Sequence, residues 1–129
     1  ISDNDNIIFN GIIRKLREIK NIDVLDVAHM SRKMIKSGTE EVSLEYYYTE
    51  ITSENVDKWY AIEYLIDKLN INKGNIMTIG DNVNDKLMIE NAGCGVVMGN
   101  SASYIKEIGD MIVADNNQDG VAEAIEKNF

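Results

Sequence analysis

The chain has 129 residues, 44% of them hydrophobic, which is enough for one buried core but not for two. Its formal net charge of −9 argues against a general nucleic-acid binder, which would need a basic face. No apolar run approaches the roughly 18 residues of a membrane span, and the single cysteine can form no disulfide within the chain. We therefore expect a cytoplasmic protein without nucleic-acid or membrane partners. Because the chain begins at Ile1 rather than Met and has no proline, we also expect it to be a piece of a longer protein.

A small α+β unit is predicted over residues 1–51. Residues 1–6 are polar and indicate a loop, so Asp3 and Asp5 read as loop residues rather than as a nucleophile motif, which would follow an apolar strand. Residues 7–19 predict a helix, because apolar residues recur there at helical spacing. The predicted inner face of this helix consists of Ile8, Ile12, Leu16 and Ile19.

Strands are predicted over residues 22–28 and 42–51, which are rich in β-branched and aromatic residues. Residues 30–39 are compatible with either a strand or a short helix. One face of the second strand is predicted to carry Val42, Leu44, Tyr46 and Tyr48. The tyrosines of this strand could line a substrate pocket, but aromatic residues at alternating strand positions usually serve packing. The only histidine, His29, has no partner motif and is expected to be structural or exposed.

A polar joint over residues 51–55 precedes a second helix, for which Asp57 is a plausible N-cap and Lys58 the first residue. The helix is expected to end near Asn70. Its apolar positions are Ala61, Ile62, Leu65, Ile66 and Leu69. A cation at a helix N-terminus opposes the helix dipole at a cost of about 0.3–1 kcal/mol, and such a position favours an anion nearby. A lone lysine there is nevertheless more often incidental.

Helices and strands alternate from residue 57 onward, which predicts an α/β fold with a parallel sheet and right-handed crossovers. Strands are expected at 76–79, 95–98 and 111–113, and further helices over residues 87–91, 101–108 and 119–127, the last with Val121, Ala124 and Ile125 inward. Ligands of open parallel sheets lie outside the carboxyl ends of the strands. The acidic loop 81–85, which follows the first of these strands, is therefore where chemistry is expected.

Asp81 and Asp85 offer hard oxygen ligands of the kind that Mg²⁺ prefers. The alternative is that loop 81–85 is a polar turn and helix cap, which Asn and Asp favour in any case. The glycines of residues 93–99 precede an apolar run instead of following one, so they do not fit a dinucleotide-binding fingerprint. Cys94, between two of these glycines, is expected to be a small buried hydrophobic residue.

Lys58, the loop Gly80-Asp81-Asn82-Val83-Asn84-Asp85 and the run from Asn91 to Asn100, NAGCGVVMGN, together resemble the C-terminal half of the haloacid dehalogenase (HAD) superfamily. The similarity is to its Cof-type branch of sugar-phosphatase-like hydrolases, which the run ADNNQDGV over residues 114–121 also resembles. It covers residues 52–129 well, whereas residues 1–51 resemble, more loosely, the end of that branch's cap domain. The resemblance implies half of a Rossmann-like core in three layers, preceded by the remnant of an α+β cap domain.

The same resemblance implies a Mg²⁺-dependent phosphatase that hydrolyses small phosphorylated metabolites through an aspartyl-phosphate. Asp81 would be a metal ligand, and Asp85 would support the metal, directly or through water, and orient Lys58. Lys58 would neutralise the nucleophile and the transferred phosphoryl group, and Asn84 would face the phosphate or the substrate.

The sequence departs from the family pattern in two respects. Trp59 stands where the family usually has glycine after the motif lysine, and it could crowd the site. The nucleophile motif DxDGT and the Ser/Thr phosphate motif are absent from residues 1–129. We therefore expect the nucleophile to lie outside this chain, in a missing N-terminal core half, and the chain alone to be inactive. The alternative is a non-catalytic fragment or a Mg²⁺-binding interaction module.

Overall fold

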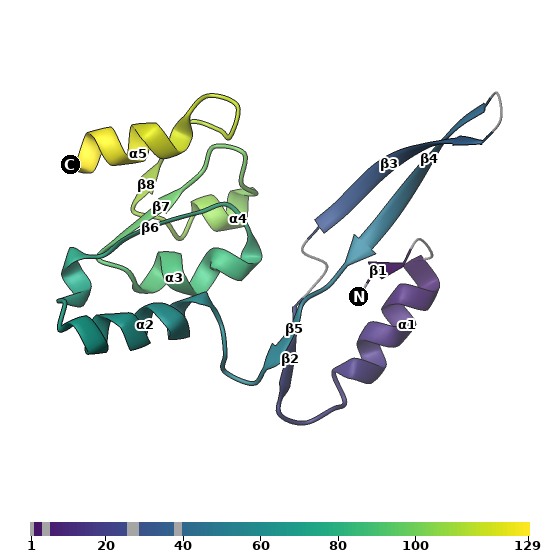
Figure 1. Ribbon diagram of the computed structural model, residues 1–129, viewed down its shortest axis with the longest axis horizontal. Helices are drawn as coiled ribbons and strands as arrows, with labels where there is room; N and C mark the ends of the chain where they lie inside the picture. Colours follow the sequence, from purple (N-terminus) through teal and green to yellow (C-terminus); the bar gives the residue numbers. More distant parts are fainter. Residues whose placement is uncertain (1, 4–5, 26–28, 38–39) are drawn as a thin grey trace. The chain divides into compact units, whose positions relative to one another are not determined.

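The computed structural model divides the chain into two units, Ile1–Val56 and Asp57–Phe129 (Figure 1). It describes residues 2–3, 6–25, 29–37 and 40–129. Each unit has its own sheets, so the two are described separately. Among the described residues, no helix combines the length and the apolar character that crossing a bilayer requires.

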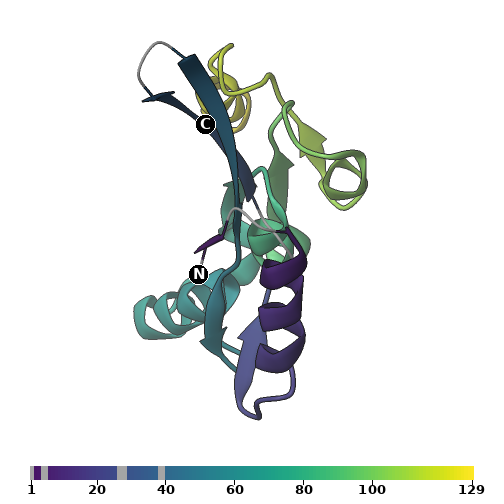
Figure 2. The ribbon, with the colours of Figure 1, turned by 90° about the vertical axis from the view of Figure 1, so that its right-hand side faces the viewer.

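The first unit is built from antiparallel strands and one helix. Its elements are β1 (Ser2–Asp3), α1 (Asn6–Leu16), β2 (Ile22–Val24), β3 (His29–Ser37), β4 (Glu40–Tyr48) and β5 (Ile51–Ser53). One sheet has the strand order β1-β4-β3, and β2 pairs with β5 in a second, two-stranded sheet. Figures 1 and 2 both show the β3–β4 hairpin as a long twisted ribbon.

The structure decides one open prediction in this unit and corrects two others. The segment 30–39 contributes a strand, β3, rather than a short helix. The predicted loop at residues 1–6 is wrong at Ser2–Asp3, which pair with the end of β4. The single strand predicted over residues 42–51 is instead two strands with different partners. Between these two strands, the buried Thr49 hydroxyl donates a hydrogen bond to the carbonyl of Leu25, which anchors the chain where it changes sheets.

Helix α1 is confirmed, but its predicted inner face is wrong. Phe9 and Ile13 are buried, with 0% and 6% exposure, and the Phe9 ring lies 5.8 Å from the ring of Tyr47 in β4. The predicted positions Ile8 and Ile12 are exposed. Both pairs have the same four-residue spacing, so periodicity alone could not distinguish them.

The second unit contains a three-stranded parallel sheet in the order β6-β7-β8, which confirms the α/β prediction. Its elements are α2 (Lys58–Leu69), the 3-10 turn η1 (Lys73–Asn75), β6 (Met77–Gly80), the 3-10 turn η2 (Val83–Asp85), α3 (Lys86–Asn91), β7 (Cys94–Val97), α4 (Ser103–Lys106), β8 (Met111–Ile112) and α5 (Gly120–Asn128). Figure 1 shows α3 on one face of the sheet and α5 on the other, with α2 outside α3.

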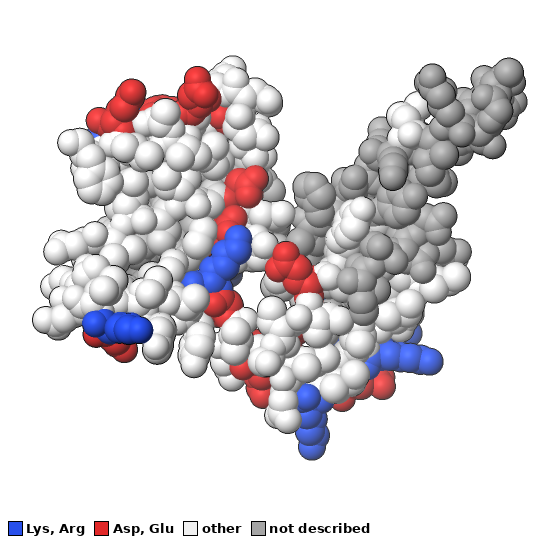
Figure 3. Space-filling view, viewed as in Figure 1, with Lys and Arg blue, Asp and Glu red and all other residues white. Residues whose placement is uncertain are grey.

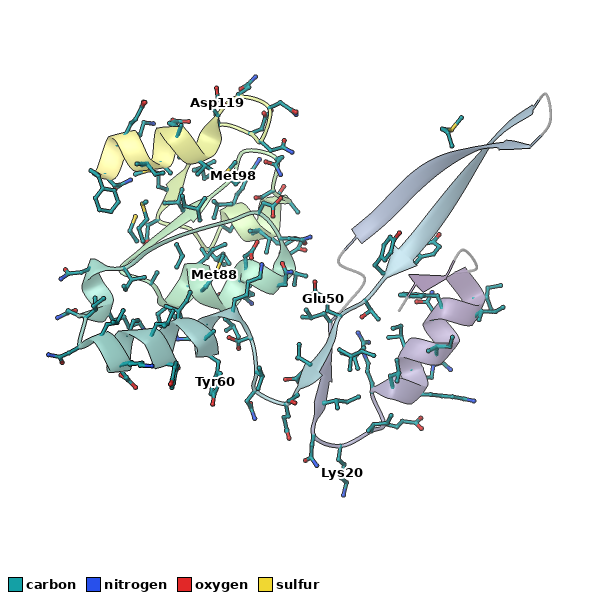
Figure 4. All side chains as sticks on the ribbon, viewed as in Figure 1. Lys20, Glu50, Tyr60, Met88, Met98 and Asp119 are labelled. Carbon is teal, nitrogen blue, oxygen red and sulfur yellow. The ribbon has the colours of Figure 1, made fainter. Side chains whose placement is uncertain are left out.

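The core of this unit has two parts, one on each face of the sheet. Val96 and Val97 are adjacent in β7, so their side chains point to opposite faces. Val96 packs in a cluster with Met98, Val113 and Ala124 of α5, and Figure 4 shows Met98 between the sheet and that helix. Val97 packs with Ile89 of α3 and Ile105 of α4. The sheet is therefore buried between helices on both faces.

The inner faces of α2 and α5 also differ from their predictions. In α2, Trp59 is the buried residue, whereas Leu65 and Leu69 are exposed; Tyr60 points away from α3 (Figure 4). In α5, Ala124 is buried, and Val121 and Ile125, which were predicted to point inward, are about half exposed.

Candidate functional site

The carboxyl ends of the three parallel strands bring three loops to one edge of the sheet. Asp81 directly follows β6, Asn100 follows β7, and Asn116 follows β8. Parallel sheets commonly place their ligand sites at this edge. The candidate site residues described below all belong to the second unit, Asp57–Phe129.

The loop after β6 is closed by a capping box at the start of η2. The side chain of Asn82 accepts a hydrogen bond from the backbone of Asp85, and the side chain of Asp85 accepts one from the backbone of Asn82. Asp85 Oδ2 lies 2.9 Å from the backbone nitrogen of Asp81 and 3.2 Å from that of Asn82. Backbone N–H groups of its own loop therefore fix the carboxylate of Asp85.

Gly80 makes room for this carboxylate. A Cβ atom on Gly80 would lie 2.5 Å from the Cβ and 3.0 Å from Oδ2 of Asp85, closer than real Cβ contacts allow. Any side chain at position 80 would therefore push Asp85 aside. Gly80, which the family resemblance includes without assigning it a role, therefore has a steric role in the site.

Lys58 approaches Asp85 from the first turn of α2. The lysine Nζ lies 2.6 Å from Asp85 Oδ1. Asp57 caps the helix, because its Oδ1 accepts a hydrogen bond from the backbone N–H of Tyr60 at 2.9 Å. The Asp57 cap and the helix start at Lys58 thus agree with the sequence prediction, and they set the direction in which the lysine leaves the helix.

Asp81 is exposed, and its Oδ2 accepts a hydrogen bond from Asn100 Nδ2 at 3.0 Å. Asn100 Oδ1 in turn accepts one from the backbone N–H of Asn116 at 3.2 Å. Sequence reasoning did not single out Asn100 as a site residue. The available signal was its place just beyond a buried strand that neighbours the strand before Asp81.

The structure therefore brings Lys58 and Asp85 into contact, and Asp81 lies in the same loop as Asp85, to which its backbone nitrogen is hydrogen-bonded. Asn84 lies half-buried within η2. Of the DxD pair in the first unit, Asp3 lies in β1, and Asp5 is outside the described residues.

Trp59 is buried on another side of α2. Its ring lies 4.8 Å from Lys73 Nζ, and it lines a pocket of about 310 Å³ together with Glu63, Ile66, Asp67 and Lys73. A cation over the face of an indole is a favourable contact. The residue that departs from the family pattern thus packs against η1.

The described residues fit Mg²⁺ only as part of a ligand set. No three His, Cys, Asp or Glu side chains in the described ranges lie close enough together to hold a metal ion. Both oxygens of Asp85 already have partners, one of them Lys58. Asp81 Oδ1, by contrast, has no hydrogen-bond partner among the described residues. One or two protein carboxylates, completed by water and substrate phosphate, are the usual ligands of Mg²⁺, so Asp81 fits as one ligand.

Figure 3 shows Asp and Glu side chains at several places on the second unit, some of them at its upper end, where Figure 1 places α5 and the loop before it. Glu123, in α5, has a pKa below its ordinary value. The main cause is the hydrogen bond from the Lys127 side chain, and a hydrogen bond from the backbone N–H of Ala114 adds to it. This carboxylate caps the segment after β8 and is not part of the site.

The family model of haloacid dehalogenase-like hydrolases matches residues 3–125, almost the whole chain. The chain belongs to the haloacid dehalogenase-like hydrolase family. The resemblance to the Cof-type HAD hydrolases that the motifs indicate is thereby confirmed. The match also includes residues of the first unit, for which the sequence resemblance was looser.

Curated and solved relatives agree with this HAD assignment. The chain is 41% identical over 76 residues to the 5-amino-6-(5-phospho-D-ribitylamino)uracil phosphatase YcsE of Bacillus subtilis, covering 59% of this chain and 30% of that protein. A haloacid dehalogenase-like hydrolase structure from Bacteroides thetaiotaomicron matches with a TM-score of 0.68 and 30% identity over 94% of this chain and 40% of that one. A similar hydrolase from B. subtilis matches with a TM-score of 0.70 and 25% identity over 98% and 39% of the two chains. This HAD chain therefore spans well under half the length of these relatives.

Proposed function

We propose that this HAD chain supplies the lysine and the metal-binding acidic loop of a Mg²⁺-dependent phosphatase that hydrolyses small phosphorylated metabolites through an aspartyl-phosphate. The observation that carries the proposal is the 2.6 Å contact between Lys58 Nζ and Asp85 Oδ1 beside Asp81. In the loop that carries Asp85, Asp81 Oδ1 has no hydrogen-bond partner among the described residues and would be the oxygen that binds a cation. Relatives with phosphatase names support the reaction class, and one acts, by its name, on a phosphorylated ribitylamino uracil.

Each residue would have a distinct role. Asp81 would bind Mg²⁺, which supplies positive charge to the phosphoryl oxygens when bound. Lys58, held by Asp85, would place its ammonium group beside the nucleophile and the phosphoryl group, where negative charge develops during transfer. Asn84, in the same loop, would face the phosphate or the substrate. The nucleophilic aspartate would come from protein outside residues 1–129.

We further propose that residues 1–51 are the end of a cap domain and residues 52–129 the C-terminal half of the catalytic core, in a cytoplasmic protein. The division of the structure at Val56–Asp57 and the share of the relatives that the chain covers support this proposal. Substrate choice would then depend mainly on the cap.

The Lys58–Asp85 contact favours the enzyme over a Mg²⁺-binding interaction module. A module that only binds a cation gains nothing from an ammonium group close to its carboxylates, because like charges repel. A phosphatase needs both charges, since the metal and the lysine act on one phosphoryl group. The ion pair is thus the feature that separates the two candidates.

The test compares the full-length protein, its Asp81→Asn variant and residues 1–129 alone in the hydrolysis of an aryl phosphate with and without Mg²⁺. We expect Mg²⁺-dependent turnover only from the full-length protein, with severe loss in Asp81→Asn. Turnover by residues 1–129 alone would refute an external nucleophile. If the full-length protein hydrolysed neither the aryl phosphate nor a panel of sugar and nucleotide phosphates, the phosphatase proposal would be wrong.

A further inference from the structure

The side chain of Asn100 joins the loops that follow all three parallel strands of the HAD sheet. Its Nδ2 donates to Asp81 Oδ2 at 3.0 Å, and its Oδ1 accepts from the backbone N–H of Asn116 at 3.2 Å. Asp81 follows β6, Asn100 follows β7 and Asn116 follows β8. One short amide therefore connects the candidate metal ligand to the far loop of the sheet.

The two partners determine which way the amide of Asn100 faces. A backbone N–H can only donate, so it requires the amide oxygen. An ionised carboxylate can only accept, so it requires the amide nitrogen. The reverse orientation would lose both hydrogen bonds and place the amide oxygen against the carboxylate of Asp81. Asn100 thus presents a donor to Asp81 in a fixed direction.

The fold does not need this side chain to keep the loops together. The backbone N–H of Met98 donates to the carbonyl of Gly80 at 3.0 Å, and that of Gly99 donates to the carbonyl of Ala114 at 3.1 Å. These bonds already connect the segment after β7 to the ends of β6 and β8. Asn100 is itself exposed, so its side chain contributes little buried packing. Its hydrogen bonds therefore act mainly on Asp81.

We propose that Asn100 is a positioning residue that orients the metal-binding carboxylate of Asp81, an inference that rests on the proposed function. By occupying Oδ2, the Asn100 amide leaves Oδ1 of Asp81 as the oxygen without a partner among the described residues. A carboxylate that is hydrogen-bonded on one oxygen loses less rotational freedom when its other oxygen binds a cation. Groups that orient a metal ligand in this way typically contribute about 10–100-fold to metal affinity or activity.

The test measures binding of Mn²⁺, used as a probe for Mg²⁺, to the full-length protein by electron paramagnetic resonance of the free ion, without substrate. We expect Asn100→Ala to weaken Mn²⁺ binding at least about 10-fold. In turnover assays the Mg²⁺ concentration for half-maximal activity should rise by a similar factor, whereas kcat at saturating Mg²⁺ should stay close to that of the unchanged protein. A merely structural role would lower the melting temperature without this separation.

Asn91→Ala is the matched control. Its amide also donates a hydrogen bond within the second unit, to the carbonyl of Leu87 at 2.8 Å, but does not touch the site. We expect Mn²⁺ affinity to be unchanged in this variant. Asn100→Ser provides a second substitution if Asn100→Ala does not fold, with the same expected loss of affinity.

Two negative results can be told apart. If Asp81→Asn abolished Mn²⁺ binding while folded Asn100→Ala or Asn100→Ser bound as tightly as the unchanged protein, the positioning role would be refuted and the metal site would stand. If Asp81→Asn bound Mn²⁺ as well as the unchanged protein, the metal site itself would fail, and with it the role of Asn100.

Discussion

Lys58 and Asp85 form an ion pair whose two members differ in burial. The lysine side chain is 52% exposed, whereas the carboxylate is 6% exposed, although their charged atoms are 2.6 Å apart. The buried carboxylate is also held by two backbone N–H groups of its own loop. The pair is therefore anchored on the side of Asp85, and the ammonium group keeps an open side toward solvent.

This asymmetry predicts that Lys58 matters more for catalysis than for stability. Lys58→Met keeps most of the side-chain volume, and the buried carboxylate of Asp85 keeps its two backbone N–H donors in this variant. We expect the melting temperature of the full-length protein to change little while kcat falls about 10²–10³-fold, as when an electrostatic stabiliser is removed. A drop of several degrees with turnover retained would show that the lysine is structural.

Asp85, unlike Lys58, should also contribute measurably to stability. In Asp85→Ala, the backbone N–H groups of Asp81 and Asn82 lose their buried acceptor, which should lower the free energy of unfolding by about 1–3 kcal/mol. Asp85→Asn keeps one acceptor oxygen and should fall between the alanine variant and the unchanged protein. Urea unfolding of the three proteins measures the order, and equal stabilities would contradict the capping role of Asp85.

Gly80→Ala tests the close approach between the end of β6 and the side chain of Asp85. The new Cβ would lie 2.5 Å from the Cβ of Asp85, so Asp85 must shift and its hydrogen bonds in the loop would be disturbed. We expect both lower stability and loss of Mg²⁺-dependent turnover. Gly11→Ala is the matched control, because nothing lies within 4 Å of its added Cβ and alanine favours α1 by about 0.5–1 kcal/mol. If Gly80→Ala behaved like Gly11→Ala, the steric argument would be wrong.

Glu123 predicts how the second unit responds to acid. Its pKa is lowered, mainly by the hydrogen bond from Lys127. An acid whose pKa is lower in the folded than in the unfolded state stabilises the fold at pH values above its unfolded pKa. That stability is lost as the pH falls below the ordinary glutamate value of 4.5 toward the lower folded pKa. Between neutral pH and about pH 3, the melting temperature of the Glu123→Gln variant should therefore fall less steeply than that of the unchanged protein. At neutral pH the variant should be the less stable of the two. Glu126→Gln, an exposed change on the same helix, should keep the steep decline.

Sequence reasoning could find the parallel sheet and the acidic loop because both depend on local order. Alternating helices and strands dictate the parallel arrangement, and Asp81 and Asp85 belong to a single turn after one strand. Sequence reasoning could not determine which face of each helix is buried. In α1, residues 7–9 and 12–13 are all apolar, so two neighbouring faces satisfy the same period. Only the contact of Phe9 with Tyr47 in β4 shows which face is buried.

The only site residues that could be predicted were those to which the family resemblance assigns a role. Lys58 and Asp85 lie 27 residues apart, and no periodicity joins them; the family resemblance suggested their contact. Asn100 was missed because its role depends on two tertiary hydrogen bonds, to Asp81 and Asn116, rather than on a local pattern. The steric role of Gly80 was missed for the same reason, since it requires knowing where the side chain of Asp85 turns back.

The capping box of Asn82 and Asp85 has a consequence for the order in which the site is assembled. Its hydrogen bonds span at most four residues, so the turn can form as soon as its own residues meet. The ammonium group of Lys58 reaches Asp85 only after the chain between them, 27 residues in sequence separation, has brought its two ends together. Closing this longer loop costs more conformational entropy and is therefore slower. During folding, the acidic turn should thus exist before its lysine arrives. In that interval the nascent loop would attract cations more strongly than the finished one does.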